Sequence, residues 1–587
     1  MKHHLNKIFK ISTLALALSL PMLGISQTAQ QNQAAAAAEQ RYDAIRPIFS
    51  AIHGTQGMVA TEHELASQIG LEILKQGGNA IDAAVAVGFA LAVVLPNAGN
   101  IGGGGFMMLH DAKSGESVAI DFREVAPLKG SRDMYLNDKG EVIDGKSLYT
   151  HVAVGVPGTV AGMEHALKKY GTMSLDKILE PAIRLAEEGF VIGEPLAQKL
   201  ASEAQYLGKF EAGKKIFFKG DEPLKTGDLL VQKDLANSLR LIAKEGSKAF
   251  YEGEIAQKIV AEMEKHGGLI SMEDMKGYQI AERKPIVGDY RGHQVVTMPP
   301  PSSGGVHLVQ ILNIIENDDI KSAGVNSAHN IHLTAEAMKM AYADRSEYLG
   351  DPDFVKVPVK GLTSKEYAKA LREQINLDKA RPSSEIKPGQ PQPYESDQTT
   401  HYSIIDKEGN AVAVTYTLNM NFGSGIVAEG TGILLNNEMD DFSAKPGVAN
   451  AFGLIGGDAN AIEPKKRPLS SMTPTIVLKD GKVSMITGSP GGARIITTVL
   501  QTIVNTIDHD MNAAEASVTP RFHHQWSPDE IRIEEGISPD TIKLLEAKGH
   551  KVSLKAPMGV VQVIHARPDG FYGFSDPRNS DGKTVAY

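Results

Sequence analysis

The spacing of apolar positions changes repeatedly along the chain, between the period of a helix and the period of a strand. Over residues 65–73, apolar side chains recur every four positions and stop shortly before a glycine pair, which predicts an amphipathic helix. A second helix is expected over residues 79–95, and because it is apolar on every side it should be buried. Further helices are predicted over residues 160–169, 175–188, 235–245, 254–265, 306–315, 327–347 and 493–507.

Shorter runs rich in β-branched and aromatic residues predict strands. Residues 400–406 and 411–418 are of this kind, and the four residues between them are turn formers, so a β-hairpin is expected. If the residues that flank the turn face each other, Thr399 falls opposite residue 418, give or take one, with Thr417 and Asn419 beside it. Other strand pairs are predicted at residues 106–110 with 118–122, 475–479 with 482–487, and 560–566 with 571–574.

Composition narrows the class of protein. With 42% hydrophobic residues the 587-residue chain can bury large cores, and its length allows up to about four domains. The net charge of −10 is mild and no long basic run is present, which makes nucleic acid or an anionic membrane surface an unfavourable partner. The chain has no cysteine, which excludes disulfides and zinc–thiolate sites.

The N-terminal region has the pattern of an export signal. Residues 1–26 carry lysines, then an apolar run over residues 11–23, then small residues, which predicts a secretory signal peptide. The run is shorter than the roughly 20 residues of a membrane helix, and no later segment qualifies as one. Residues 27–41 are rich in Gln and Ala and indicate a flexible leader. We therefore expect a periplasmic or secreted protein with no membrane contact after signal removal; a retained N-terminal anchor is the alternative.

Three local motifs could indicate a binding site for a nucleotide, a metal or another ligand. Residues 423–428 match a dinucleotide fingerprint, but glycines shortly after them interrupt the helix that should follow, so nucleotide binding is rejected. His523 and His524 lack carboxylates at ligand spacing, and no metal is assigned. The glycine run at residues 102–105 serves either the close packing of a strand under a helix or a contact with a ligand.

Thr399, at the start of the predicted hairpin, is the candidate nucleophile. A threonine hydroxyl attacks well when a base takes its proton, and one solution uses the α-amine of that threonine after the chain is cut before it. Five motifs follow in order: TTHYS from residue 399, TYTLN from 415, LLNNEMDDFS from 434, RPLSSM from 467 and GSPGG from 488. Over nearly all of residues 55–587, the chain with these motifs resembles the gamma-glutamyltranspeptidases.

The resemblance implies a fold and a processing step. It implies an α+β fold, the four-layer αββα sandwich of the N-terminal nucleophile hydrolases, made as one chain that cuts itself between Gln398 and Thr399. Residues 27–398 would form the large subunit and residues 399–587 the small catalytic subunit, and the two would build one αββα unit as a heterodimer.

The resemblance also implies roles for individual residues. Taken alone, an arginine at a strand end, two loop serines and an acidic cluster are most often surface features, and the glycines before a helix are a common loop that can serve as an anion site. In the family pattern they acquire functions. Thr399 attacks and Thr417 orients it, Gly491 and Gly492 stabilise the oxyanion, Arg123, Ser470 and Ser471 hold the substrate α-carboxylate, and Asn419, Glu438 and Asp441 hold its α-amino group.

Residues 443–467 carry many Gly, Pro and Asn residues and predict a long loop, either disordered or a functional lid. The resemblance favours a lid over the pocket. Many bacterial members of the family have a tyrosine where Phe452 stands, so a hydroxyl hydrogen bond across the pocket is missing here.

The implied reaction is the cleavage of γ-glutamyl amides such as glutathione through a threonine acyl-enzyme. Water, amino acids or dipeptides would accept the γ-glutamyl group, and neither a cofactor nor a metal is expected. Two alternatives stay open at this point. A cephalosporin-type acylase would share the fold and the cut but not the paired Arg123 and Asp441, and an exported γ-glutamyl-peptide-binding protein would keep that pair but stay uncut.

Overall fold

The computed structural model describes residues 49–387 and 399–587. The predicted signal peptide at residues 1–26, the leader at residues 27–41 and Gln398 lie outside the described residues. Within the described ranges, no helix combines the length and the apolar character needed to cross a membrane.

The predicted hairpin lies at the centre of a seven-stranded sheet. β12 (Thr400–Asp406) pairs antiparallel with β13 (Ala411–Thr417), and every residue of both strands is buried. The buried residues of β12 include polar ones such as His401 and Ser403, which are hydrogen-bonded to Thr415 and to the carbonyl oxygen of Gln562. The strand order is β23 (Lys583–Ala586), β2 (Gly57–Thr61), β12, β13, β3 (Gly104–His110), β4 (Ser117–Asp121) and β9 (Ala281–Arg283).

A second seven-stranded sheet packs face to face on the first, with β12 and β13 in contact with its central strands. The two hairpins predicted at residues 475–487 and 560–574 both belong to it. Its strand order is β1 (Ile52–Gly54), β22 (Gly570–Ser575), β21 (Gln562–Arg567), β17 (Lys482–Gly488), β16 (Thr475–Lys479), β11 (His293–Thr297) and β10 (Ile286–Tyr290).

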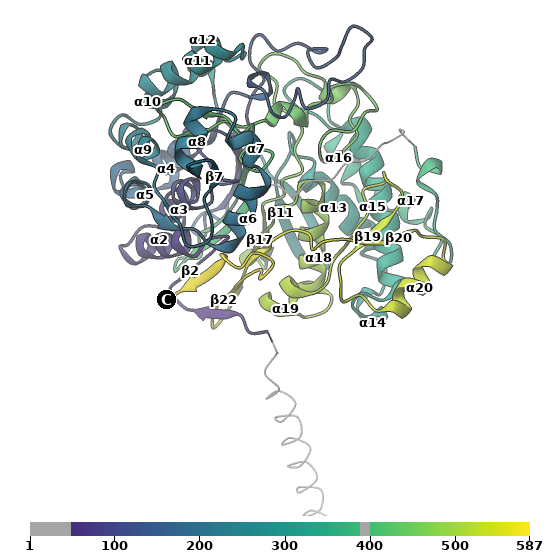
Figure 1. Cartoon of the computed structure of the whole chain (residues 1–587). Coiled ribbons are helices and arrows are strands. Elements are labelled where there is room, and N and C mark those ends of the chain that lie inside the picture. Colours follow the sequence, from purple (N-terminus) through teal and green to yellow (C-terminus); the bar gives the residue numbers. More distant parts are fainter. Residues whose placement is uncertain (1–48, 388–398) are drawn as a thin grey trace, which may run out of the picture. The chain divides into compact units, whose positions relative to one another are not determined.

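Helices cover the outer faces of both sheets, as Figure 1 shows. On the first sheet lie α2 (Glu64–Lys75) and α3 (Ala80–Val94), and all residues of α3 are buried, as its uniform apolar pattern predicts. α5 (Leu175–Glu188) packs on α3, and α9 (Lys233–Glu245) packs on α5. On the second sheet lie α13 (Gly304–Ile315) and α18 (Ile495–Ile507), and α15 (Ala328–Tyr348) packs on α13. The predicted αββα sandwich is confirmed.

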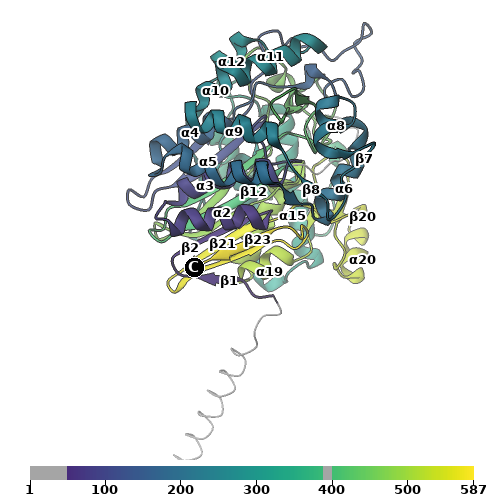
Figure 2. The same cartoon turned by 60° about the vertical axis from the view of Figure 1, so that its left-hand side comes forward.

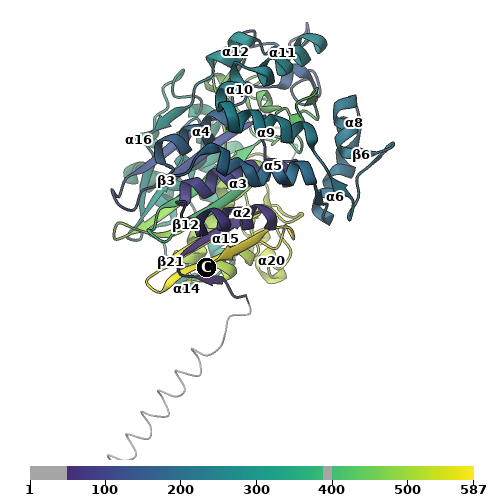
Figure 3. The same cartoon turned by 90° about the vertical axis from the view of Figure 1, so that its left-hand side faces the viewer.

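The helices α10, α11 and α12 gather at one end of the sandwich, and the C-terminal strand β23 lies beside β2 at the edge of the first sheet (Figures 2 and 3). The remaining helices are α4 (Thr159–Tyr170), α6 (Glu194–Ser202), α7 (Ala204–Leu207), α8 (Glu211–Phe217), α10 (Ser247–Tyr251), α11 (Glu254–His266), α12 (Met272–Gly277), α14 (Ile320–Ala323), α16 (Val359–Leu362), α17 (Lys365–Arg372), α19 (Ala513–Val518) and α20 (Pro539–Ala547). Short strands are β5 (Phe190–Val191), β6 (Phe218–Lys219), β7 (Glu222–Pro223), β8 (Leu229–Leu230), β14 (Val427–Ala428), β15 (Ile433–Leu434), β18 (Phe522–His523), β19 (Ile531–Ile533) and β20 (Val552–Leu554).

The register of the central hairpin agrees with the prediction within its stated tolerance. Ile405 faces Ala411 and Thr400 faces Tyr416, so the next position along places Thr399 level with Thr417 rather than with residue 418. The expected lack of a helix after the glycines of residues 423–428 is confirmed, because Val427–Ala428 is a strand and the next strand, β15, follows it.

Candidate active site

Thr399 immediately precedes β12 and is 8% exposed. Its Oγ1 donates a long hydrogen bond of 3.4 Å to Oγ1 of Thr417, which in turn accepts a bond of 2.9 Å from the N–H of Asn419. The φ angle of Thr399 is 146°, in a region that β-branched residues almost never occupy. Backbone strain therefore lies at the residue before which the chain is predicted to be cut.

The glycine run before β3 lets the backbone approach Thr417. A Cβ on Gly103 would lie 2.1 Å from the carbonyl oxygen of Thr417, and one on Gly102 would lie 2.0 Å from that of Leu434. The side chain of Asn100 donates a 2.8 Å hydrogen bond to the same oxygen of Thr417. These contacts support the packing interpretation of the glycine run, which fixes the strand end that faces Thr399.

Thr399 lines two cavities of very different size. The smaller has a volume of about 20 Å³, room for about one water molecule. The larger has a volume of about 750 Å³, and Gly491, Glu62, Lys199 and Asn579 also line it. The smaller cavity brings together nearly all the site residues expected from the sequence: Arg123, Thr399, Thr417, Asn419, Glu438, Asp441, Ser470, Ser471 and Gly492, with Phe452 beside them.

Arg123 is fully buried and lies among carboxylates. One terminal nitrogen binds Glu438, the other binds Asp441, and the carboxylate of Glu124 lies 3.8 Å away. The two ends of the expected substrate clamp are therefore paired with each other in this structure. Three carboxylates around one guanidinium give the cavity an excess of negative charge whenever all three are ionised.

The titration of these groups follows from their burial. Burial raises the pKa of Glu124 to about 7, raises that of Glu438 well above its usual range and raises that of Asp441, while Arg123 opposes all three shifts. Burial alone would lower the pKa of Arg123, but the three carboxylates outweigh it and raise this pKa above its usual value. A ligand ammonium group placed here would favour the ionised carboxylates.

One of the two serines, Ser471, is hydrogen-bonded to an arginine that the sequence interpretation missed. Arg345 on α15 donates a 3.2 Å hydrogen bond to Oγ of Ser471 and one of 2.9 Å to Oγ of Ser303. Burial lowers the pKa of Arg345 to about 10. Oγ of Ser470 accepts from the N–H of Met472 at 3.0 Å. The only sequence signal for Arg345 was a charged residue inside a helix that turns out to be buried on all sides.

Gly491 and Gly492 lie between β17 and α18, where the predicted helix begins as a short 3₁₀ turn. Their φ angles are 132° and 52°, which glycine adopts readily. A Cβ on Gly492 would lie 2.5 Å from Cδ1 of Phe452, so the lid residue packs directly on this turn. Across the same cavity, Oδ1 of Asn419 is buried and has no hydrogen-bond partner among the described residues.

The histidine beside the nucleophile is not a suitable base. His401 is fully buried, its ring nitrogens bind Thr415 at 2.8 Å and Ser403 at 3.1 Å, and burial lowers its pKa to about 3. Within the described ranges, no histidine lines either cavity that Thr399 touches.

Glu62 is a second site-lining residue that the sequence interpretation missed. It lines the larger cavity, accepts a 3.2 Å hydrogen bond from the N–H of His401 and is attracted by Lys199. Burial nevertheless raises the pKa of Glu62 to about 7. In the sequence Glu62 stands just before a predicted helix, and no feature of the neighbouring residues indicates that it lies near Thr399.

Two other candidate groups have structural partners. Asp440, the third acid of the cluster around Glu438, accepts hydrogen bonds from Ser147 at 2.7 Å and from the N–H of Ala451 at 3.0 Å, and lines neither cavity. His523 and His524 are buried, and burial lowers the pKa of both. Neither belongs to a group of three metal-ligating side chains in the described part of the chain.

A buried threonine at the start of a central strand in an αββα sandwich defines the class of N-terminal nucleophile hydrolases. Residues 66–586 match the family model of gamma-glutamyltranspeptidase, and the chain belongs to that family. It is 60% identical over 548 residues to the glutathione hydrolase proenzyme of Escherichia coli (strain K12), covering 93% of this chain and 94% of that protein. The expected family and enzyme class are confirmed, and the alternative of a binding protein without catalysis is wrong.

Two solved structures are similar over long stretches. The cephalosporin acylase from Bacillus halodurans superposes with a TM-score of 0.82 at 30% identity, covering 93% of this chain and 98% of that one. A chain of the gamma-glutamyltranspeptidase from Helicobacter pylori superposes with a TM-score of 0.56 at 50% identity, covering 60% of this chain and 98% of that one.

Proposed function

We propose that the protein is a self-processing gamma-glutamyltransferase and glutathione hydrolase that is cut between Gln398 and Thr399. In the first step, Oγ1 of Thr399 attacks the carbonyl carbon of Gln398 and the peptide C–N bond breaks, which leaves an ester. The hydroxyl proton passes to the released nitrogen, which becomes the free α-amine of Thr399. Water then hydrolyses the ester, so that Gln398 ends in a carboxylate and Thr399 regains its hydroxyl. The strained φ angle of Thr399 supports this site of cleavage.

The freed α-amine is the base of the later reaction. It takes the proton from Oγ1 of Thr399 as that oxygen attacks the γ-carbonyl carbon, and it returns the proton to the leaving amine as the C–N bond breaks. Thr417 orients the hydroxyl, and the N–H groups of Gly491 and Gly492 stabilise the oxyanion. Water or the amine of an amino acid or dipeptide then takes the γ-glutamyl group. The absence of a titrating histidine along the described cavity walls supports the amine as base.

Substrate recognition rests on an exchange of ion pairs. The smaller cavity, at about 20 Å³, is too small for a glutamyl group as it stands. We assign the substrate α-carboxylate to Arg123 with Ser470 and Ser471, and the α-ammonium to Asn419, Glu438 and Asp441. The ion pairs of Arg123 with Glu438 and Asp441 are thereby replaced by pairs of Arg123 with the substrate carboxylate and of the two acids with the substrate ammonium. Each charge keeps a partner while the cavity opens.

The larger cavity, of about 750 Å³, is also lined by Thr399 and has room for the leaving group and the acceptor. The proposal includes a heterodimer of residues 27–398 and residues 399–587, and export to the periplasm or the medium after removal of residues 1–26.

The observation that carries the proposal is the position of Thr399, strained at a strand start and next to the Arg123–Asp441 pair. The test compares the parent protein with Thr399→Ala by gel electrophoresis, N-terminal sequencing and release of p-nitroaniline from γ-glutamyl-p-nitroanilide. We expect two chains in the parent, the smaller beginning at Thr399, and one inactive chain in the variant. A parent that stays uncut yet is fully active would refute the mechanism.

A cephalosporin acylase activity is the second candidate, since such an enzyme superposes over 93% of this chain. The substrates separate the two functions. Cleavage of glutaryl-7-aminocephalosporanic acid with a kcat/KM above that for glutathione would favour the acylase, because a glutaryl group has no ammonium for Asp441 to bind.

A further inference from the structure

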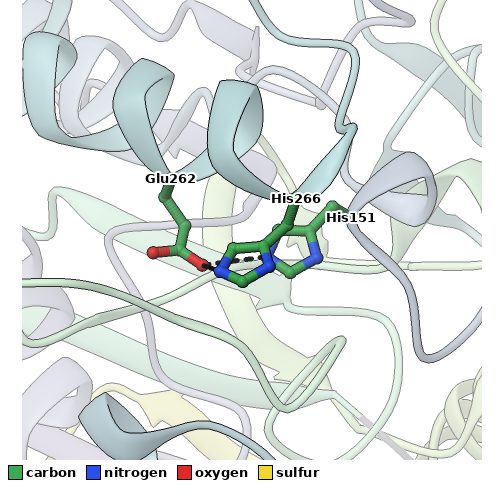
Figure 4. Close-up of side chains that lie close together, drawn as sticks. All are labelled: His151, Glu262 and His266. Atoms are coloured by element: carbon green, nitrogen blue, oxygen red, sulfur yellow. Dashed lines mark hydrogen bonds and ion pairs between the residues drawn. The ribbon is translucent and has the colours of Figure 1, made fainter.

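Three side chains with metal-ligating groups converge in a part of the molecule that the proposed reaction does not use. His151 lies in a 3₁₀ turn, η1 (His151–Ala153), and Glu262 and His266 lie one turn apart at the end of α11, as Figure 4 shows. Nε2 of His151 is hydrogen-bonded to Oε1 of Glu262 at 2.9 Å, and Nε2 of His266 lies 3.5 Å from the same carboxylate oxygen. None of the three lines a cavity that Thr399 touches.

These distances match the ligand set of a tetrahedral ion. Zinc binds imidazole nitrogen and carboxylate oxygen at about 2.0–2.2 Å, which places neighbouring ligand atoms about 3.3–3.5 Å apart. Of the two observed N–O separations, 3.5 Å lies at the upper end of that range and 2.9 Å lies below it, and all three ligand atoms lie within 4.8 Å of one another. Because the two rings are stacked at an interplanar angle of 20°, the partly exposed ring of His266 has to turn out of the stack so that both in-plane lone pairs meet one ion.

The surroundings hold His151 and Glu262 in place and leave His266 at the entrance. The rings of His151 and His266 stack with centroids 4.7 Å apart, and Phe210 packs edge-on against both. The side chains of His151 and Glu262 are each 6% exposed, whereas His266 is 29% exposed. An ion can enter from solvent past His266 into a site otherwise walled by protein.

We propose that His151, Glu262 and His266 form a binding site for a divalent first-row transition metal, with zinc as the best match. Two imidazoles and one carboxylate are ligands that zinc accepts, and a water molecule would complete the fourth position.

A second cluster in the described part of the chain shows what distinguishes this one. His332, Glu336 and His550 also lie close together. There, however, the ammonium of Lys339 already binds Glu336 at 2.8 Å, and Nδ1 of His332 is hydrogen-bonded to Nε2 of His550 at 2.7 Å. A lysine that neutralises the carboxylate leaves no net charge to attract a cation, so this cluster serves as an internal control.

The expected role of the site is structural. η1 packs against η3 (Glu438–Asp441), the turn that carries two groups of the proposed substrate clamp. Next to His151, Val152 packs in a small apolar cluster with Met439 and Phe442. An ion held by His151 and α11 would therefore tie the helix to the segment that supports the wall of the smaller cavity.

The test uses the full-length purified protein after treatment with a chelator and dialysis. Zinc binding is measured by isothermal titration calorimetry, and Co²⁺ is added separately for its visible absorption, with Mg²⁺ as a control ion. The variants are His266→Asn and Glu262→Gln in the proposed site and His550→Asn in the control cluster. The side chain of His266 is partly exposed and lies at a helix end, so its replacement should leave the fold intact. Thermal unfolding of each protein is recorded with and without zinc.

We expect one zinc per chain in the parent protein and in His550→Asn, with a tetrahedral Co²⁺ spectrum and a Tm that rises with zinc. His266→Asn and Glu262→Gln should keep the Tm of the metal-free parent to within a few degrees and lose the zinc-dependent rise. The proposal is overturned if the parent binds no zinc at micromolar concentration, if His266→Asn binds it as tightly as the parent, or if only His550→Asn loses binding. In each of these cases the cluster is a hydrogen-bonded triad alone.

Discussion

Phe452→Tyr is the most specific perturbation that the site suggests. Phe452 is buried, packs on Gly492 and lines the smaller cavity together with Asn419. Oδ1 of Asn419 is a buried acceptor without a partner among the described residues. A tyrosine hydroxyl added at the ring edge can donate to this oxygen and connect the loop of residues 443–467 to the end of β13.

The magnitude follows from the net value of one hydrogen bond. A bond to a buried and previously unsatisfied acceptor contributes about 1 kcal/mol, which changes the ratio of closed to open loop roughly fivefold. Limited proteolysis within residues 443–467 should slow by a similar factor. Formation of the acyl-enzyme should hardly change, because Phe452 is not among the nucleophile, clamp or oxyanion groups.

The assay separates the two effects. Burst release of p-nitroaniline from γ-glutamyl-p-nitroanilide reports acylation, and the ratio of γ-glutamyl-glycylglycine to free glutamate reports how acceptor and water compete. We expect an unchanged burst rate and a changed ratio in Phe452→Tyr, whereas Phe452→Leu, which lacks the hydroxyl, should not slow proteolysis. The reasoning is refuted if the acylation rate falls severalfold while the ratio stays constant, because Phe452 would then belong to the acylation machinery.

Two further predictions concern buried carboxyls. Asp441→Asn should raise KM for γ-glutamyl substrates roughly 30- to 1000-fold, since removing one partner of a buried charge pair costs about 2–4 kcal/mol, while cleavage before Thr399 persists. Glu62→Gln should change the pH dependence of stability, because burial raises the pKa of Glu62 from 4.5 to about 7. The folded parent then binds a proton that the unfolded chain releases, and it loses stability as pH rises through this window. Above pH 7 the free energy of unfolding of Glu62→Gln should therefore exceed that of the parent by at most about 3 kcal/mol. The gain is smaller because Lys199 loses the carboxylate that attracts it, and it vanishes below pH 4.5.

Each of these has a matched control. For Asp441 the control is Asp440→Asn, the same change at the neighbouring residue. The Asp440 carboxylate binds Ser147 and the N–H of Ala451 and does not line the cavity, so KM should stay within a few fold of the parent value. An unchanged KM in Asp441→Asn would show that this carboxylate does not hold the substrate ammonium. For Glu62 the control is Glu64→Gln, whose side chain is 55% exposed. Urea unfolding of Glu62→Gln that matches the parent at both pH 5 and pH 8 would contradict the buried-charge explanation.

Elements with a clear local pattern were predictable. The run of residues 80–94, apolar except for Asp82, forms a fully buried helix with Asn79 as its cap, and the hairpin around residues 407–410 forms with its register within one residue. The αββα sandwich and the identity of the site residues came from the family resemblance, whose five motifs lie in strands, turns and helix starts of the C-terminal third. The site roles drawn from that resemblance stay predictions until the variants above are measured.

The sequence by itself determined the periodicities, the turn residues, the candidate nucleophile and the types of side chain at the site. Only the tertiary structure decided that Arg123 pairs with Glu438, 315 positions away, that Arg345 supports Ser471 and that Glu62 lies beside the nucleophile. Periodicity and turn propensity depend on neighbours within a few residues, so they can be seen in the chain. Charge pairing and pKa shifts depend on which distant groups share a buried, poorly solvated space, and that is fixed only when the sheets and helices pack.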